Sequence, residues 1–194
     1  MKKEMLIDAL ATRGWFHQND FMDSKFCLEL LNEAKTLDWK KAKVGTGAKR
    51  LEDQAIRNDS TYWIDENKET KLQRQYLDQM HELMKEINQT LYLGLKEFEC
   101  HFAHYSTDGF YKKHLDQHQG SNKRAVSVIF YLNEPEGGGE LVIYNKDHPD
   151  DVETKISPAA GSFVCFLSNQ IYHEVLPTKG ERYSLTGWFR TSVS

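Results

Sequence analysis

Residues 124–133 read RAVSVIFYLN, the longest of several apolar stretches in the second half of the chain. It is rich in Val, Ile, Phe and Tyr, which is typical of a β-strand. Similar short apolar stretches bounded by turn signals lie on both sides of it: FECHFAHY (98–105), GFYKKHLD (109–116), ELVIYN (140–145), SFVCFL (162–167), YHEVLP (172–177) and RYSLTGWFR (182–190). Many short, closely spaced strands predict a β-sandwich or barrel over residues 98–194.

Upstream of this region the apolar residues recur at steps of three and four, which predicts helices. One helix contains Leu6 and Leu10, and a second carries Phe26, Leu30, Leu31, Ala34 and Leu37 beyond the turn-like RGWFHQND (13–20). A third is expected from about Glu69 to Leu91, with one apolar stripe: Leu72, Tyr76, Met80, Leu83, Met84 and Ile87. We therefore expect an α+β protein with a mainly β core, in which residues 1–97 form a helical support region and the whole chain is one structural unit.

The chain has 194 residues, a net charge of −4 and a pI near 6.1. This charge offers no broad attraction to nucleic acid or anionic lipid, so neither is an expected partner. Neither a signal peptide nor a membrane-spanning apolar run is evident. The three widely spaced cysteines do not form a C-x-x-C pair, which favours a reduced compartment. We expect a cytoplasmic protein, whereas the sequence does not predict its oligomeric state.

Residues 40–56, KKAKVGTGAKRLEDQAI, are basic, contain two glycines and lack periodicity. We interpret them as a surface loop on the substrate side, and a mobile lid over a substrate cleft is the functional alternative. The fragment GTGAK is not a nucleotide-binding loop, because the spacing and the Ser or Thr of a Walker A motif are missing. A second glycine cluster, 137–139, is interpreted as a turn that returns the chain to the sheet.

His114 and Asp116 form an H-x-D pair in the predicted strand GFYKKHLD. Side chains two apart on a strand share a face, so both should project toward one point. A divalent ion needs a further ligand, and His173, on another predicted strand, is the best candidate. Two imidazoles and one carboxylate suit a mononuclear iron(II) site, although the spacing taken alone also arises by chance.

Other histidines are weaker candidates. His118 continues the same alternation, but a QGSN turn follows and should take it out of the strand. His148 and Asp150 form a second H-x-D pair, which Pro149 and the acidic neighbours place in an exposed loop. The remaining histidines lack a partner at diagnostic spacing and are interpreted as structural or surface residues: His17, His81, His101 and His104.

Arg182 lies nine residues after His173, on an otherwise apolar predicted strand. A guanidinium in such a place is costly unless it meets a carboxylate, so it could receive an anionic co-substrate. The alternative is an arginine that faces outward and keeps its head in water, and strand alternation does not exclude this.

Together these segments resemble the prolyl hydroxylase branch of the iron(II)- and 2-oxoglutarate-dependent dioxygenases, especially the oxygen-sensing prolyl hydroxylases and their bacterial relatives. The likeness covers nearly the whole chain and rests on Tyr105 ahead of GFYKKHLD, then IFYLN, GGGELVIY, YHEV and RYSLTGW, with GWFHQNDFM and IRNDSTYWID upstream. It implies a double-stranded β-helix, or jelly roll, buttressed by the N-terminal helices.

The resemblance also implies roles for individual residues. His114, Asp116 and His173 would be the catalytic iron(II) ligands. Arg182, assisted by the Tyr131 hydroxyl, would bind the distal carboxylate of 2-oxoglutarate. Further pocket-lining positions are implied for four residues: Tyr105, Leu141, Thr186 and Trp188.

The activity implied by the resemblance is hydroxylation of a substrate C–H bond, with dioxygen as co-substrate and decarboxylation of 2-oxoglutarate to succinate and CO2. Ascorbate is expected as a stimulatory ligand. A prolyl residue in a protein is the favoured target, with a translation factor among the candidates. A free amino acid or small metabolite is the alternative substrate. A non-enzymatic or zinc-binding jelly-roll module remains a further alternative.

Overall fold

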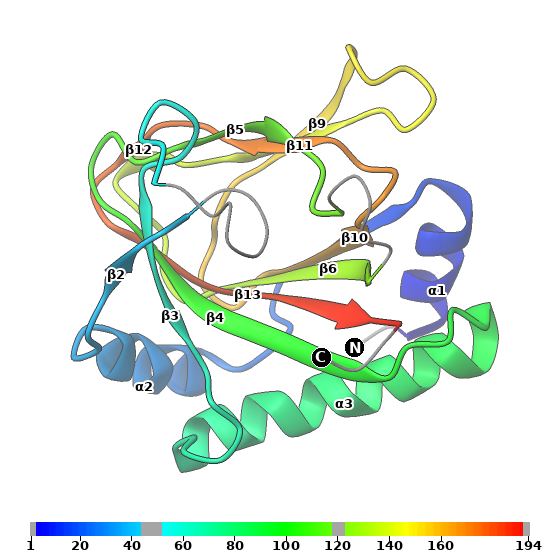
Figure 1. Ribbon diagram of the computed structural model, residues 1–194, viewed down its shortest axis with the longest axis horizontal. Helices are drawn as coiled ribbons and strands as arrows, with labels where there is room; N and C mark the ends of the chain where they lie inside the picture. Colours follow the sequence, from blue (N-terminus) through cyan, green and yellow to red (C-terminus); the bar gives the residue numbers. More distant parts are fainter. Residues whose placement is uncertain (1–2, 44–51, 118–122, 192–194) are drawn as a thin grey trace.

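The structure, a computed structural model, describes residues 3–43, 52–117 and 123–191. Two β-sheets face each other, and helices α1 (Lys3–Thr12), α2 (Ser24–Ala34) and α3 (Lys71–Leu91) cover the outer face of the larger sheet (Figure 1). This arrangement confirms the predicted α+β class with a mainly β core, and the fold is the expected jelly roll.

The sheets are antiparallel throughout and contain the predicted strands. The larger has the order β1 (Trp15–Gln18), β10 (Phe163–Leu167), β6 (Arg124–Tyr131), β13 (Arg182–Arg190), β4 (Glu97–Tyr105), β3 (Asp59–Trp63) and β2 (Lys40–Lys41). The smaller has the order β5 (Tyr111–His114), β11 (His173–Val175), β8 (Leu141–Tyr144) and β9 (Val152–Ile156). A short ribbon pairs β12 (Thr178–Lys179) with β7 (Gly137–Gly138).

Strand alternation divides the core into two layers. On β6, Val128 and Phe130 belong to the cluster that packs against the helices, whereas Ile129 and Tyr131 belong to the cluster between the two sheets. The same alternation on β13 turns Leu185 toward the helices. The residues of β13 that alternate with Leu185 therefore face the space between the sheets, where the candidate site lies.

The long helix α3 begins with a capping box formed by Thr70 and Gln73, close to the predicted start. Both side chains also donate hydrogen bonds to the Glu33 carboxylate of α2, with Thr70 Oγ1 at 2.9 Å from Oε2. One carboxylate thus joins the ends of two helices that support the same face of the sheet.

The sequence missed several strands. The segment 13–20, expected as a turn, contains β1, because Trp15 and Phe16 are both buried and pair with β10. The expected helical region also supplies β3, and the exposed edge strand β9 is too polar to be recognised by alternation. The proposed boundary near residue 97 stays a prediction.

No helix in the described part of the chain has the length and apolar character needed to cross a bilayer.

Candidate active site

Strand pairing brings His114 and His173 together. They are direct register partners across β5 and β11, with ring centroids 4.2 Å apart. The Nδ1 atom of His114 lies 2.6 Å from the Lys112 carbonyl oxygen, and that of His173 lies 3.1 Å from the Ile171 carbonyl oxygen. Because only a protonated Nδ1 can donate to a carbonyl, each ring keeps a free electron pair on Nε2. Both histidines are therefore oriented as metal ligands.

Asp116 completes the cluster from a position just beyond the end of β5. Its Oδ1 is 3.5 Å from His114 Nε2, and its Oδ2 is 3.7 Å from His173 Nε2. One donor atom from each of the three residues lies within 4.8 Å of the others, which fits a single metal ion. The H-x-D pattern correctly placed the two side chains together, although Asp116 follows the strand instead of continuing it.

The electrostatics favour the protonation states that bind metal. Burial acts to raise the pKa of Asp116, but the positive charges that His173 and His114 carry when they are protonated at low pH outweigh it and hold that pKa well below its usual range. Burial and the neighbouring His114 lower the pKa of His173 to about 4. At neutral pH the carboxyl group is thus ionised and the buried imidazole of His173 is neutral.

Arg182 lies on the inner face of β13 and is 1% exposed, so the interpretation of an outward-facing arginine is wrong. Its guanidinium carbon lies 4.8 Å from the ring centroid of Tyr105 and 4.9 Å from that of Tyr131. Neither its Nε nor the Tyr131 hydroxyl has a hydrogen-bond partner among the described residues. Burial raises the pKa of Tyr131 despite the nearby Arg182 charge, which keeps the hydroxyl a neutral donor. The Arg182 guanidinium and the Tyr131 hydroxyl are thus two neighbouring hydrogen-bond donors, one of them positively charged, and this combination suits a carboxylate.

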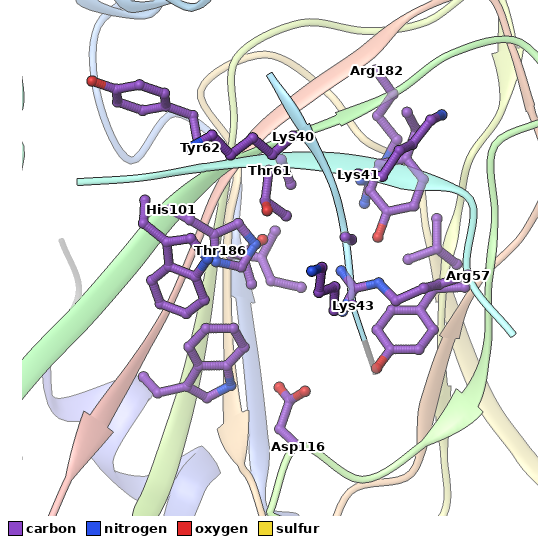
Figure 2. Close-up of a pocket in the computed structure, with 18 of the residues that line it drawn as sticks. Lys40, Lys41, Lys43, Arg57, Thr61, Tyr62, His101, Asp116, Arg182 and Thr186 are labelled. Carbon is purple, nitrogen blue, oxygen red and sulfur yellow. The ribbon is translucent and has the colours of Figure 1, made fainter. Parts of the chain in front are cut away.

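One cavity of about 490 Å³ connects these features. In Figure 2, Asp116 enters it from one side and Arg182 from the other. The predicted site residues that line it are His114, Asp116, His173, Arg182, Tyr105, Leu141, Thr186 and Trp188. Tyr131 does not line it but is fully buried next to Arg182. The structure thus brings all nine predicted residues into one site, while their individual roles stay predictions.

Tyr111 and Arg57 line the cavity but were not predicted as site residues. Tyr111 stacks on His114 with ring centroids 3.6 Å apart. The guanidinium carbon of Arg57 lies over the Tyr111 ring, 4.1 Å from its centroid. Arg57 also makes two hydrogen bonds of 2.6 Å to the buried Asp59. No spacing in the sequence indicates this stack.

His101 was interpreted as structural or surface, yet it lines the cavity. Its ring lies 4.7 Å from that of Trp63 and 5.4 Å from that of Trp188. Strand alternation could have found it, since it shares a face of β4 with Ala103 and Tyr105.

The rival candidates lie outside this cavity. His148 and Asp150 are in an exposed turn, where Asp150 is 3.5 Å from Lys113. His104 stacks on Tyr183 with ring centroids 4.4 Å apart, and His81 packs against Phe98. His118 lies outside the described residues.

The basic segment predicted as a loop begins at the cavity. Lys40, Lys41 and Lys43 line it, with Lys40 and Lys41 on strand β2 (Figure 2). The substrate-side role of this segment stays a prediction, and its residues 44–51 lie outside the described residues.

Comparisons with known proteins agree with this geometry. Residues 100–190 match the 2OG-Fe(II) oxygenase superfamily. A PKHD-type hydroxylase of Maricaulis maris is 40% identical over 87 residues, which are 43% of this chain and 37% of the relative, so the match spans little more than a third of that curated protein.

Solved structures extend the similarity over the chain. A Pseudomonas putida prolyl-4-hydroxylase is 38% identical, with a TM-score of 0.86 over 98% of this chain and 100% of that one. A prolyl hydroxylase from Trichoplax adhaerens, solved with a hypoxia inducible factor peptide, is 25% identical, with a TM-score of 0.83 over 97% and 89% of the two chains. The chain therefore belongs to the 2OG-Fe(II) oxygenase superfamily, as a prolyl 4-hydroxylase-like dioxygenase.

Proposed function

We propose that this protein is an iron(II)- and 2-oxoglutarate-dependent hydroxylase that acts on a prolyl residue within a protein or peptide. One observation carries the proposal: a buried guanidinium without an ion-pair partner among the described residues shares a cavity with a His-Asp-His cluster. The first feature fits a carboxylate, and the second fits a metal ion that retains open coordination positions.

The residues present fit the groups that this reaction needs. His114, Asp116 and His173 would hold iron(II), which activates dioxygen and couples decarboxylation of 2-oxoglutarate to hydroxylation of the substrate. The Arg182 guanidinium and the Tyr131 hydroxyl would hold the distal carboxylate of the co-substrate, and so fix its position by charge-assisted hydrogen bonds.

The other predicted residues would shape the cavity. Tyr105 stacks beside Arg182 and limits the movement of the guanidinium. Leu141 supplies an apolar wall from the smaller sheet, and Thr186 and Trp188 form the opposite wall from β13. Apolar walls exclude water and so strengthen the electrostatic interactions within the site.

A protein or peptide substrate is supported by the size of the cavity and by the solved relatives. A volume of about 490 Å³ lies within the range of drug-sized ligand sites and leaves room beyond a small dicarboxylate. The Trichoplax adhaerens relative was solved with a peptide. A prolyl target is supported by the similarity to the prolyl-4-hydroxylase of Pseudomonas putida, and a translation factor is the kind of protein we propose to test first.

Two further parts of the proposal concern conditions in the cell. We place the protein in the cytoplasm, because its three cysteines are all buried and free, as expected in a reducing compartment. We also propose that ascorbate stimulates turnover by keeping the iron in its reduced state.

The proposal is tested by measuring succinate formation from 2-oxoglutarate with purified protein, iron(II) and a proline-containing protein substrate. Succinate should form only when iron(II), dioxygen and 2-oxoglutarate are all present, and addition of substrate should increase its rate. Free amino acids should not replace the protein substrate. Succinate formation stimulated by an amino acid and not by any protein would replace the proposed substrate class with a metabolite.

A further inference from the structure

The Asp116 carboxylate is held by a buried pair of serine hydroxyls. Ser127 Oγ lies 2.7 Å from Asp116 Oδ2, and Ser168 Oγ lies 2.8 Å from Ser127 Oγ. Both serines are fully buried, and Asp116 is 8% exposed. Neither serine lines the cavity, so these hydroxyls act on the site through Asp116.

Elementary hydrogen-bond chemistry sets the direction of this chain of hydroxyls. An ionised carboxylate only accepts hydrogen bonds, so Ser127 must donate its single proton to Asp116 Oδ2. The oxygen of Ser127 then accepts from Ser168. Each hydroxyl in the pair thus has one orientation, and the bond to the carboxylate is a strong, charge-assisted one.

The fold places the two serines at this point. Ser127 has the same parity on β6 as Ile129 and Tyr131, so it faces the space between the sheets. Ser168 directly follows β10, and its amide donates a 3.0 Å hydrogen bond to the Ala125 carbonyl of β6. The paired strands β6 and β10 therefore bring the hydroxyls side by side.

The same two strands hold the segment that carries Asp116. The Gln117 amide donates to the Ser168 carbonyl at 3.1 Å, and the Gln117 side chain donates to the Arg124 carbonyl at 2.9 Å. Asp116 lies beyond the end of β5, where no strand pairing fixes it. Its position thus depends on these bonds to the larger sheet.

We infer that Ser127 and Ser168 form a positioning relay, by which we mean a chain of two hydroxyls that fixes the orientation of the Asp116 carboxylate. The relay keeps Oδ2 in a hydrogen bond, so that Oδ1 alone is presented to the metal as an oxygen donor. This inference rests on the proposed function. A carboxylate that binds through one oxygen uses one coordination position, whereas a rotated carboxylate that binds through both would occupy a position needed by a co-substrate. The relay therefore contributes to metal affinity and to the number of open positions, as partners of metal ligands commonly do.

The test compares Mn(II) dissociation constants of purified variants, with Mn(II) chosen because it is stable in air. Ser127→Ala should raise the dissociation constant by about tenfold or more, and Ser168→Ala should raise it less because Ser127 still donates. Ser162→Ala is the matched control: Ser162 is equally buried, and its hydroxyl has no hydrogen-bond partner in the described part of the chain. Its Mn(II) affinity should be unchanged.

A second readout separates positioning from folding. The visible absorption spectrum of the Co(II)-loaded protein should change in Ser127→Ala and return toward that of the unmodified protein in Ser127→Thr, which restores a hydroxyl. A purely structural role would lower the thermal stability of the metal-free protein and leave this spectrum unchanged.

The outcomes also separate this inference from the proposed function. If Ser127→Ala binds Mn(II) as tightly as Ser162→Ala while Asp116→Ala loses binding, the relay is refuted and the metal site stands. If Ser127→Ala does not fold, equal affinities for Ser168→Ala and Ser162→Ala refute the relay. If Asp116→Ala retains full Mn(II) affinity, the proposed metal site itself is wrong, and the relay with it.

Discussion

Arg182 combines two properties that normally conflict, full burial and a positive charge without an ion-pair partner among the described residues. A buried charge of this kind destabilises the folded protein, so we infer that it serves to bind an anion. We predict that Arg182→Met raises the 2-oxoglutarate concentration for half-maximal succinate formation by at least about tenfold, since a charge-assisted hydrogen bond contributes roughly 1.5 to 3 kcal/mol. The melting temperature should not fall.

Arg74→Met is the matched control, because Arg74 is a half-exposed arginine on α3 that pairs with Glu69 and does not itself line the cavity. Its 2-oxoglutarate requirement should equal that of the unmodified protein. An unchanged requirement in Arg182→Met would assign the carboxylate to another group.

At the residue scale the sequence predicted most of the site. The H-x-D pair and the distant histidine were identified from spacing, and the structure brings all three together. The sequence did not indicate whether the Arg182 side chain faces inward or outward, because either face of β13 could have been the inner one. Ser127 was not identified, since a single serine within an apolar strand carries no pattern; only the three-dimensional pairing of β6 and β10 reveals its partners.

At the scale of elements, the glycine triplet is more than a turn. Gly137 and Gly138 form β7, which pairs with β12. A Cβ atom on Gly139 would lie 3.0 Å from Arg182 Cδ, so this glycine lets the chain pass close to the arginine stem. The sequence indicated the need for unusual backbone conformations but not the strand or the contact.

Gly138 and Gly94 allow a paired test of this element. Both have positive φ, +65° and +68°, but a Cβ on Gly138 would lie 2.3 Å from the Pro177 carbonyl oxygen, whereas no atom of the described residues would lie within 4 Å of a Cβ on Gly94. Gly94→Ala should therefore cost only the left-handed backbone penalty, about 1 to 2 kcal/mol. Gly138→Ala should lower the free energy of unfolding in urea by more. Equal decreases in the free energy of unfolding of the two variants would show that the β7–β12 ribbon can move aside without loss of stability.

At the scale of the whole molecule, the seven predicted strands and three helices were enough to identify the fold class, but not the sheet order. That order depends on contacts between distant segments, such as β1 joining β10 at one edge and β3 joining β4 near the other. Short strands that owe their existence to such pairing leave little periodicity in the sequence.

The buried thiols provide a test of the packed fold. Burial raises the pKa of Cys27 to about 11 and raises those of Cys100 and Cys165 further. We predict that the native protein reacts slowly with a thiol reagent at mildly alkaline pH, and that all three cysteines react rapidly after denaturation. Rapid reaction of one thiol in the native protein would locate a region that opens readily.

The proposed hydroxylation of a prolyl residue of a protein can be tested directly. The most direct test is mass spectrometry of a protein extract treated with the purified enzyme, iron(II), 2-oxoglutarate and isotopically heavy dioxygen, with Asp116→Ala as the control enzyme. We expect a prolyl residue to gain one heavy oxygen atom with the unmodified enzyme and none with the control. Heavy oxygen found in succinate but in no protein of the extract would contradict this expectation.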